Sequence, residues 1–286
     1  SDEIKVYPTA TTQHTKILEW AKKGLYRPYA EDSLETLIEV VLDFMRRVPP
    51  WIRLPRVVRD IPDGYIEAGI KCGNLRQILD RRLQDSGQPC RCIRSREIKS
   101  NIVEPRDVVW DIHRYAASGG TEYFISRASR DGRYLLGFIR LRLSKKSGLD
   151  LDGGVVFPEL VDSALIRELH VYGRTQSKSR DIGLPGNKKV SGVQHRGMGQ
   201  ALVEKAKEIA WAHGYHKISV TSGVGVRSYY LNKCGFNLLP SELYPNQSLY
   251  WNWKGLLTRL EIRVCPDPQD SPEMCYLLIA ITMVFA

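Results

Sequence analysis

The chain has 286 residues, of which 43% are hydrophobic, and its 42 Lys and Arg against 32 Asp and Glu give a formal net charge of +10. This length can bury a full hydrophobic core and hold one large or two small domains. The positive charge suits an acidic partner such as RNA or a coenzyme phosphate, although many basic proteins bind no nucleic acid. The six scattered cysteines indicate reduced thiols of an intracellular protein and argue against a disulfide framework.

Short alternating elements are predicted in the first ninety residues. In chain order they are a strand at residues 5–8, a helix at 32–48, a strand at 51–60 and a helix at 74–86. Asp32 and Glu35 predict a capping box at the start of the first helix, and Pro49 ends it. One strand–helix–strand–helix run cannot close a barrel by itself, so this region is predicted to be a piece of a larger fold.

From Arg106 onward the pattern predicts a sheet with flanking helices. The predicted elements are a helix at 107–117, strands at 121–126 and 134–143, and a central strand at 164–171. The first two strands form a hairpin around the turn Asp131-Gly132. A long polar loop then runs from 172 to 194, and a loop of that length is usually either functional or disordered.

The central strand carries two candidate catalytic side chains. Its period of two predicts two faces, one with Arg167, Leu169 and Val171 and the other with Ile166, Glu168 and His170. A carboxylate and an imidazole beside a cleft could position or deprotonate a water or an amine. Both groups could equally be structural, hydrogen-bonded within a splayed strand, and the residues alone favour neither interpretation.

A glycine turn leads into a predicted amphipathic helix at 199–212. Residues 194–199 read Gln-His-Arg-Gly-Met-Gly, and Gly197 and Gly199 lack the Cβ atoms that would hold a diphosphate away from the backbone. The N–H groups of the first turn and the positive end of the helix dipole favour an anion there. An ordinary turn is the alternative, and it is the commoner explanation of an isolated Gly-x-Gly.

Two tyrosines, Tyr229 and Tyr230, begin a further predicted helix. A phenol with an ordinary pKa of about 10 stays protonated at neutral pH. Close to a thioester sulfur, it could donate a hydrogen bond or a proton to a departing thiolate. The alternative is that one ring packs in the core while the other is half exposed.

Three motifs, in this order, resemble the Elongator catalytic-subunit family, radical enzymes that carboxymethylate wobble uridines of tRNA. The motifs are Arg167-Glu-Leu-His-Val-Tyr-Gly173, the turn at 194–199, and Ser222-Gly-Val-Gly-Val-Arg-Ser-Tyr-Tyr230. Earlier segments are similar to those that close the radical-SAM barrel of this family, namely Tyr7-Pro8, Val48-Pro-Pro-Trp51 and Arg59-Asp-Ile-Pro62. The resemblance covers roughly residues 1–240.

The resemblance implies an α+β fold in three parts. These are the C-terminal portion of a radical-SAM (β/α) barrel at 1–93, a GNAT N-acetyltransferase domain at 94–243, and a divergent, poorly ordered tail at 244–286. The implied catalytic residues are Tyr230, His170 and Glu168. The residues implied to bind acetyl-CoA are Glu168, Leu169, His170, Val171, Gln194, Arg196, Gly197, Met198, Gly199, Gln200, Ala201 and Tyr230.

The resemblance also implies S-adenosylmethionine and a [4Fe–4S] cluster as cofactors of the family. That cluster needs three thiolates on one face, and only Cys90 and Cys92 are close together here, so the radical step is not expected of this chain alone. The pair could be half of a zinc site, but tetrahedral zinc needs four ligands. Ser95 stands where many relatives have a third cysteine, and two ordinary thiols are the favoured interpretation.

A basic run around the junction of the two halves predicts contact with tRNA. The residues expected to bind it are Arg76, Arg91, Arg94, Arg96 and Lys99. Such side chains neutralise phosphates without reading bases, and the alternative is a solvated helix face.

Other Elongator subunits are further expected partners, and the expected location is the cytoplasm, with the nucleus as an alternative. No clear membrane span is expected, because the apolar residues 274–286 are fewer than the roughly 20 that cross a bilayer.

The predicted function is therefore the acetyl-CoA- and tRNA-binding part of a tRNA wobble-uridine carboxymethyltransferase, which forms 5-carboxymethyluridine. The first alternative is an ordinary GNAT lysine N-acetyltransferase with Glu168 as base and Tyr230 as acid, which needs an open groove beside Glu168. The second is a non-catalytic RNA-binding protein, which would bind tRNA without acetyl-CoA.

Overall fold

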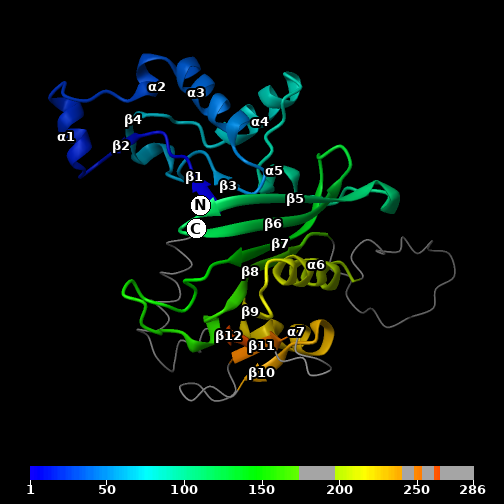
Figure 1. Cartoon of the computed structure of the whole chain (residues 1–286). Helices are drawn as coiled ribbons and strands as arrows, with labels where there is room; N and C mark the ends of the chain where they lie inside the picture. Colours follow the sequence, from blue (N-terminus) through cyan, green and yellow to red (C-terminus); the bar gives the residue numbers. More distant parts are fainter. Residues whose placement is uncertain (174–196, 240–247, 253–260, 265–286) are drawn as a thin grey trace, which may run out of the picture. The chain divides into compact units, whose positions relative to one another are not determined.

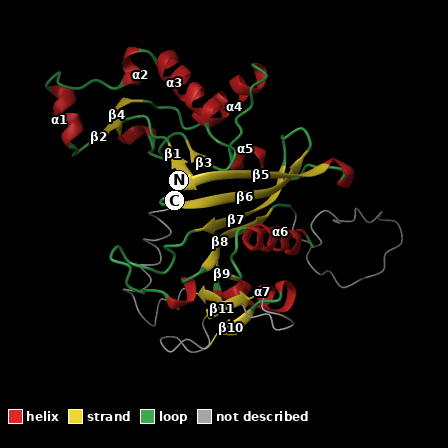
Figure 2. Ribbon diagram, in the orientation of Figure 1, coloured by secondary structure: helices red, strands yellow, loops and turns green. Residues whose placement is uncertain are grey.

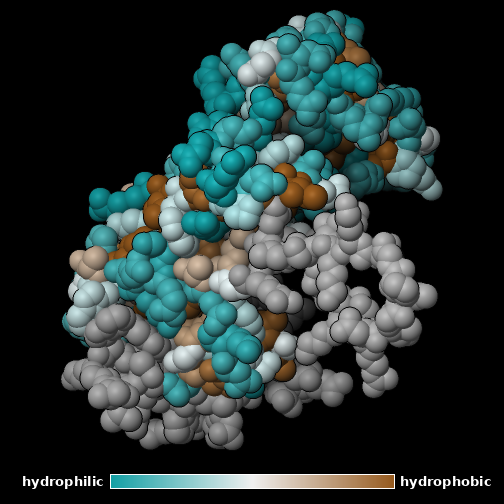
Figure 3. Space-filling model, turned by 90° about the vertical axis from the view of Figure 1, so that its right-hand side faces the viewer, coloured by the Kyte–Doolittle hydropathy of each residue, from teal (hydrophilic) through white to brown (hydrophobic). Residues whose placement is uncertain are grey.

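The computed structural model describes residues 1–173, 197–239, 248–252 and 261–264, which form two compact units (Figure 1). The first unit comprises residues 1–96, and the second begins at Glu97. The sequence places a boundary after residue 93. Each unit has a hydrophobic core of its own. On the face shown in Figure 3, hydrophilic side chains cover most of the described surface and the hydrophobic patches are small.

Helices dominate the first unit. They are α1 (Lys16–Lys22), α2 (Tyr29–Asp32), α3 (Leu34–Arg47), α4 (Leu75–Asp85) and α5 (Ile93–Arg96). Two pairs of short strands accompany them, with β1 (Glu3–Lys5) parallel to β3 (Arg53–Arg56) and β2 (Ala10–Thr12) antiparallel to β4 (Ile66–Gly69). The two long predicted helices correspond to α3 and α4, whose buried apolar residues recur every three to four residues and pack into one core.

The start of α3 differs from the predicted capping box. The extended residue before the helix is Ser33, and its hydroxyl accepts a hydrogen bond from the Thr36 amide at 3.1 Å. Asp32 ends α2, so it cannot cap α3. The Glu35 carboxylate accepts hydrogen bonds from the Arg82 guanidinium of α4. It therefore links α3 to α4 and does not form the predicted capping box.

An eight-stranded sheet forms the second unit, with strand order β10-β11-β9-β8-β7-β6-β5 and β12 beside β9 (Figure 1). The strands are β5 (Val108–Ala117), β6 (Gly120–Ser129), β7 (Leu135–Leu143), β8 (Ser163–Val171), β9 (Lys217–Ser222), β10 (Asn237–Leu239), β11 (Ser248–Asn252) and β12 (Glu261–Val264). The helices are α6 (Met198–Ala212) and α7 (Arg227–Cys234). Neighbouring strands are antiparallel, except that β9 runs parallel to β8 and to β12.

The helix predicted at 107–117 is wrong, because this segment is strand β5. Its side chains alternate between half-buried and exposed, and β-branched Val108, Val109 and Ile112 fit a pleated surface. Ser118 and Gly119 follow with φ angles of 46° and 71°. Two successive left-handed residues make the tight turn that returns the chain as β6.

Helix α6 packs on one face of the sheet (Figure 2). Leu202, Val203 and Ala206 are fully buried against strand residues that include Ile125 and Ile139. This confirms the stripe predicted for the helix.

Two segments of the range 244–286, where a poorly ordered tail is expected, form strands. β11 pairs antiparallel with β9 and β10, and β12 pairs parallel with β9. The other residues of that range lie outside the described residues. Among the helices described, none has the length and hydrophobicity needed to cross a bilayer.

Candidate functional site

Strand β8 contains a bulge that changes which side chains share a face. Leu141 of β7 is opposite Ile166, but Arg140 is opposite Glu168, so Arg167 is the extra residue. A bulge of this kind re-aims side chains and bends the strand. Ile166 packs in the core under α6 together with Leu169 and Val171, whereas Arg167 and Glu168 both reach charged partners. The simple alternation predicted for 164–171 therefore breaks at Arg167.

The pairing between β8 and β9 ends at the bulge. Within the described residues, β9 is paired with β8 over Ser163–Ile166, and the register ends at Val220. Beyond that point β8 keeps its pairing with β7 as far as Val171. The backbone edge of Glu168–Val171 that faces away from β7 is therefore left beside a strand that has separated from it.

Helix α6 begins beside this separation, at Gly197. Gly197 is the N-cap with φ 80°, a left-handed conformation that favours glycine, and a Cβ built there would meet no heavy atom of the described residues within 4 Å. The first-turn amides of a helix have no partner within the helix, and they lie at the positive end of its dipole. Met198, Gln200 and Ala201 follow the turn. Gln194 and Arg196, also predicted to bind, lie outside the described residues.

Gly199 has a structural role that the sequence pattern does not reveal. A Cβ built on it would collide with the Tyr229 hydroxyl, and it would lie 3.3 Å from Tyr229 Cζ and 3.7 Å from Val171 Cγ2. The missing side chain thus lets a ring from α7 lie against the first turn of α6. Gly197 faces open space, and Gly199 faces protein.

The two tyrosines of α7 occupy different surroundings. Tyr230 is 5% exposed, and its ring centroid lies 5.2 Å from that of Phe236 in the core, while Tyr229 is half buried at the contact with Gly199. Burial is the main cause that raises the pKa of both phenols well above the ordinary value, and the neighbouring Cys234 adds to it. Both hydroxyl groups therefore remain protonated at neutral pH.

Two side chains of α6 hold the end of α7. Gln200 Nε2 donates to the carbonyl oxygen of Lys233 at 2.5 Å, and Lys207 Nζ donates to that of Cys234 at 2.8 Å. Lys207 is only 4% exposed. Helix C-terminal carbonyls have no partner within the helix, so these bonds satisfy them and fix α7 against α6.

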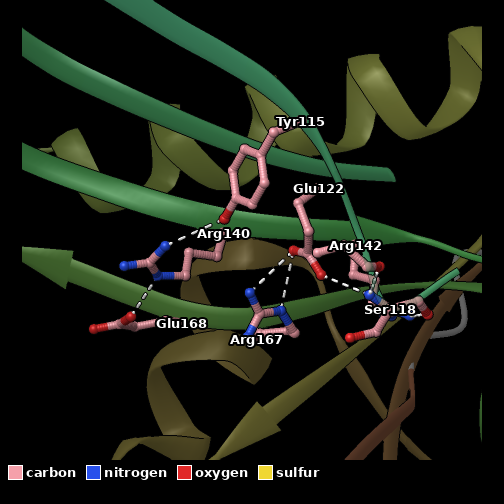
Figure 4. Close-up of polar contacts among 8 residues, drawn as sticks. Tyr115, Ser118, Glu122, Arg140, Arg142, Arg167 and Glu168 are labelled. Carbon is pink, nitrogen blue, oxygen red and sulfur yellow. Dashed lines mark hydrogen bonds and ion pairs between the residues drawn. The ribbon is translucent and has the colours of Figure 1, made fainter. Parts of the chain in front are cut away.

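A charged network lies on the opposite face of the sheet (Figure 4). The buried Arg140 guanidinium donates to the Glu168 carboxylate at 2.8 Å and approaches the Tyr115 hydroxyl at 3.5 Å. Beside it, the Glu122 carboxylate, 2% exposed, accepts from Arg142 at 2.9 Å and from Arg167 at 3.0 Å. This network joins strands β6, β7 and β8.

The environments of Glu168 and His170 differ. The carboxylate of Glu168 accepts a hydrogen bond from the buried guanidinium of Arg140. The exposed imidazole of His170 lies tilted against the Tyr172 ring at a centroid distance of 4.3 Å and stacks with Phe138 at 6.1 Å. Both side chains are exposed.

In the first unit, Cys92 has polar partners other than a metal. Its sulfur lies 3.6 Å from Arg76 Nη2 and 3.4 Å from Ser95 Oγ, and Arg76 also donates to Ser95 at 2.8 Å. A hydrogen bond from Cys90 outweighs the opposing effect of burial and, with smaller effects of Ser95 and Arg76, lowers the pKa of Cys92 below its ordinary value. In the part of the chain that is described, no three His, Cys, Asp or Glu side chains are placed to hold a metal ion.

The residues predicted to contact tRNA separate into two groups. Arg91, Arg94 and Lys99 are exposed. Arg96 is 5% exposed and donates to the carbonyls of Arg91 and Pro50, and Arg76 is bound by Asp80, Ser95 and the Leu54 carbonyl. The last two arginines therefore stabilise the first unit internally.

Sequence reasoning missed the network residues Arg140, Arg142 and Glu122, and also Lys207. Arginines at alternate positions of the apolar run at 135–143 are a signal for buried ion pairs, since a buried guanidinium requires a partner. Lys207 gave no such signal, because it belongs to a helix face on which lysines are common.

The fold and the site define a mixed α/β protein in which a glycine-started helix lies beside a bulged strand that separates from its parallel neighbour. The model of the Radical_SAM C-terminal domain family matches residues 1–85. Elongator complex protein 3 of Mus musculus is 38% identical over 245 residues, which are 83% of this chain and 41% of that protein. A protein of Methanocaldococcus infernus named tRNA uridine(34) acetyltransferase is 36% identical over 244 residues, 82% of this chain and 42% of that protein.

A solved structure agrees with these relatives. An N-terminally truncated archaeal Elp3 from Methanocaldococcus infernus superposes with a TM-score of 0.69 at 32% sequence identity, covering 88% of this chain and 55% of that one. The chain belongs to the Elongator catalytic-subunit family, as the three motifs indicated. It spans about two fifths of the length of the curated relatives.

Proposed function

We propose that this chain is the acetyl-CoA-binding and tRNA-contacting part of a tRNA wobble-uridine carboxymethyltransferase, with a GNAT-type second unit. The observation that carries the proposal is the separation of β8 from β9 after Ile166, beside the glycine-started helix α6. The name tRNA uridine(34) acetyltransferase, borne by a relative, supports acyl transfer with a tRNA substrate. Other Elongator subunits are proposed partners on the same basis.

The residues of the site fit acetyl-CoA. The open space above Gly197 and the first-turn amides of Met198 and Gly199 would receive the diphosphate. The backbone edge of Glu168–Val171 would bind the amide-bearing arm in the manner of an added strand. When bound, the coenzyme would supply an acetyl thioester. Tyr230, or the more accessible Tyr229, would donate a proton or hydrogen bond to the departing sulfur, because both phenols stay protonated at neutral pH.

A [4Fe–4S] cluster does not fit the described residues. It needs three converging thiolates, whereas Cys92 is held by Arg76 and Ser95, and no third cysteine joins Cys90 and Cys92 among the residues described. We assign no step through the cluster or S-adenosylmethionine to these residues.

The geometry favours this function over an ordinary lysine N-acetyltransferase. That alternative requires Glu168 to accept a proton from an incoming amine. The carboxylate is instead engaged by Arg140, which donates to it at 2.8 Å.

Titration calorimetry with acetyl-CoA tests the proposal. Gly197→Glu places a carboxylate at the helix N-terminus where the diphosphate would bind, so we expect affinity to fall at least tenfold, about 1.4 kcal/mol. Gly132→Glu is the matched control, because Gly132 also has a left-handed φ of 73° and no neighbour within 4 Å of its Cβ position. Equal affinities of the two variants, or no binding by the unmodified protein, would refute the acetyl-CoA site.

A further inference from the structure

A cavity of about 700 Å³ lies at the end of the sheet in the second unit, open to solvent. Its walls are the β5–β6 turn, the residues after β7 and the end of α6. A volume of this size is typical of sites for small molecules or single nucleotides. The 15-residue helix α6 separates this cavity from Gly197 by about 20 Å, at 1.5 Å per residue. The cavity is thus distinct from the proposed coenzyme site.

The charged side chains that line the cavity are cationic. Lys145 and Lys146 are exposed on one wall, and among the residues that the structure describes no Asp or Glu belongs to the lining. The Lys145 ammonium lies 4.7 Å from the ring centroid of Tyr215. The nearby carboxylate of Asp162 acts on the Tyr215 hydroxyl and contributes to raising its pKa, after burial. Two adjacent ammonium groups at a cavity mouth favour an anion.

The turn that forms the opposite wall has its acceptor atoms engaged elsewhere. The carbonyl oxygens of Ala117 and Ser118 accept from the Arg142 guanidinium at 3.0 and 2.7 Å. Carbonyl dipoles directed at a guanidinium are not available to repel an anion in the cavity. The small residues of this turn, with Gly119 and Gly120, also leave the wall shallow.

A fixed histidine forms the remaining wall. His213 Nδ1 lies 2.8 Å from the carbonyl oxygen of Ile209, so this nitrogen carries a proton. In the neutral ring Nε2 then accepts from the Tyr123 hydroxyl, 2.9 Å away. These two bonds orient the ring without using either lysine.

We propose that this cavity binds one nucleotide of an RNA strand, with Lys145 and Lys146 on its phosphate. An open cavity lets a chain enter and leave, which a site for a free small molecule does not require. The net charge of +10 suits a polyanion. The choice of RNA rests on the proposed function, whereas the anion site itself does not.

The test measures binding of a fluorescein-labelled single-stranded RNA of about 12 nucleotides by anisotropy, between about 50 and 200 mM salt. We expect K145Q/K146Q to weaken binding at least fivefold and to reduce the salt slope by about 0.7, the contribution of one phosphate contact to a single strand. K22Q/K23Q is the matched control, because it removes two adjacent exposed lysines from the first unit. Equal effects of the two variants, or an unchanged slope, would overturn the proposal.

Two further measurements separate the possible outcomes. Acetyl-CoA affinity of K145Q/K146Q should equal that of the unmodified protein, and this holds or fails independently of the RNA result. In the second measurement adenosine monophosphate competes with the labelled RNA, and we expect it to displace RNA only at far higher concentration. If the mononucleotide binds as tightly as the RNA and loses affinity in K145Q/K146Q, the site takes a free nucleotide and the RNA assignment is wrong.

Discussion

At the scale of single residues, the two glycines of the turn do different work. Gly197 supplies a left-handed backbone conformation at an open helix end, and Gly199 lets Tyr229 approach α6. The sequence indicates an anion-binding turn at both positions, because Gly-x-Gly before a helix is the local signal. It cannot indicate that Tyr229, thirty residues later, lies against Gly199, because that contact depends on how α7 packs.

Replacing Gly199 should therefore act through Tyr229. We expect Gly199→Ala to displace the Tyr229 ring and to weaken acetyl-CoA binding at least tenfold, about 1.4 kcal/mol. Gly225→Ala is the control, because a Cβ there meets nothing within 4 Å. Calorimetry measures the affinities, and the near-ultraviolet circular dichroism of the tyrosines reports the displacement. An unchanged spectrum and affinity in Gly199→Ala would show that the contact has no consequence.

The buried phenol of Tyr230 should make the protein sensitive to alkali. Its pKa is raised in the folded state, so folding keeps the proton that the unfolded chain loses at a pH of about 10. Stability is then full below pH 10 and falls above it, by up to about 1.4 kcal/mol per pH unit. Urea unfolding measured between about pH 9 and 11 gives the unfolding free energy at each pH. The fall of this free energy with pH should be less steep for Tyr230→Phe. Tyr65→Phe, at a residue 65% exposed, should keep the slope of the unmodified protein, and a slope unchanged by Tyr230→Phe would contradict the assignment.

At the scale of secondary-structure elements, hydrophobic periodicity predicted the elements that depend only on the local sequence. Strands β6, β7 and β8 and helix α6 follow from their hydrophobic periods. The bulge at Arg167 does not, because the sequence alternates evenly through it and only the pairing with β7 reveals the extra residue. Strand β5 was missed for the opposite reason. Its polar residues Asp111, His113 and Arg114 obscure a period of two that becomes clear beside β6.

The Glu122 carboxylate should be essential to this sheet. It bridges Arg142 and Arg167 in a buried setting, and Glu122→Gln would leave two guanidinium groups without their counter-charge. Breaking such a pair from one side costs about 3–5 kcal/mol. The exposed pair of Lys205 and Glu208 provides the control, since Glu208→Gln should cost less than about 1 kcal/mol. If chemical denaturation showed that both variants lose the same unfolding free energy, the buried network would contribute no more to stability than a surface ion pair.

At the scale of the whole molecule, the two units divide the proposed work. The first unit presents Arg91 and Arg94 at its surface, and the second contains the glycine-started helix and the separated strands. The family resemblance predicted from the sequence is confirmed by the relatives. The internal use of Arg76 and Arg96 was not predictable, because a basic run does not reveal which guanidinium groups find carbonyls inside the fold.

Contact of the exposed arginines with tRNA phosphates should appear in the salt dependence of binding. Replacing both Arg91 and Arg94 by glutamine should reduce the slope of log K against log salt by about 1.8, the contribution of two phosphate contacts. A variant with Arg106→Gln and Arg130→Gln removes two exposed charges from the second unit and should alter the slope less. Filter binding across a salt series gives both values, and an identical slope in the first variant would show that its arginines face solvent only.

The last prediction concerns what the site does with acetyl-CoA. An amine acetyltransferase needs a free base and should acetylate peptides whether or not RNA is present, whereas Glu168 is engaged by Arg140. A carboxymethylating enzyme must keep its thioester from water until tRNA docks. We therefore expect slow hydrolysis of acetyl-CoA by the protein alone, faster hydrolysis with tRNA, and no modification of histone-like peptides.

Matched tyrosine variants sharpen this measurement. Tyr230→Phe and Tyr229→Phe each remove one hydroxyl while keeping the ring, so the variant with the lower tRNA-stimulated rate identifies the phenol that serves the departing sulfur. Tyr65→Phe should leave the rate unchanged, because that side chain lies exposed in the first unit. Robust peptide acetylation that Glu168→Gln abolishes and tRNA does not affect would replace the carboxymethyltransferase proposal with the lysine acetyltransferase.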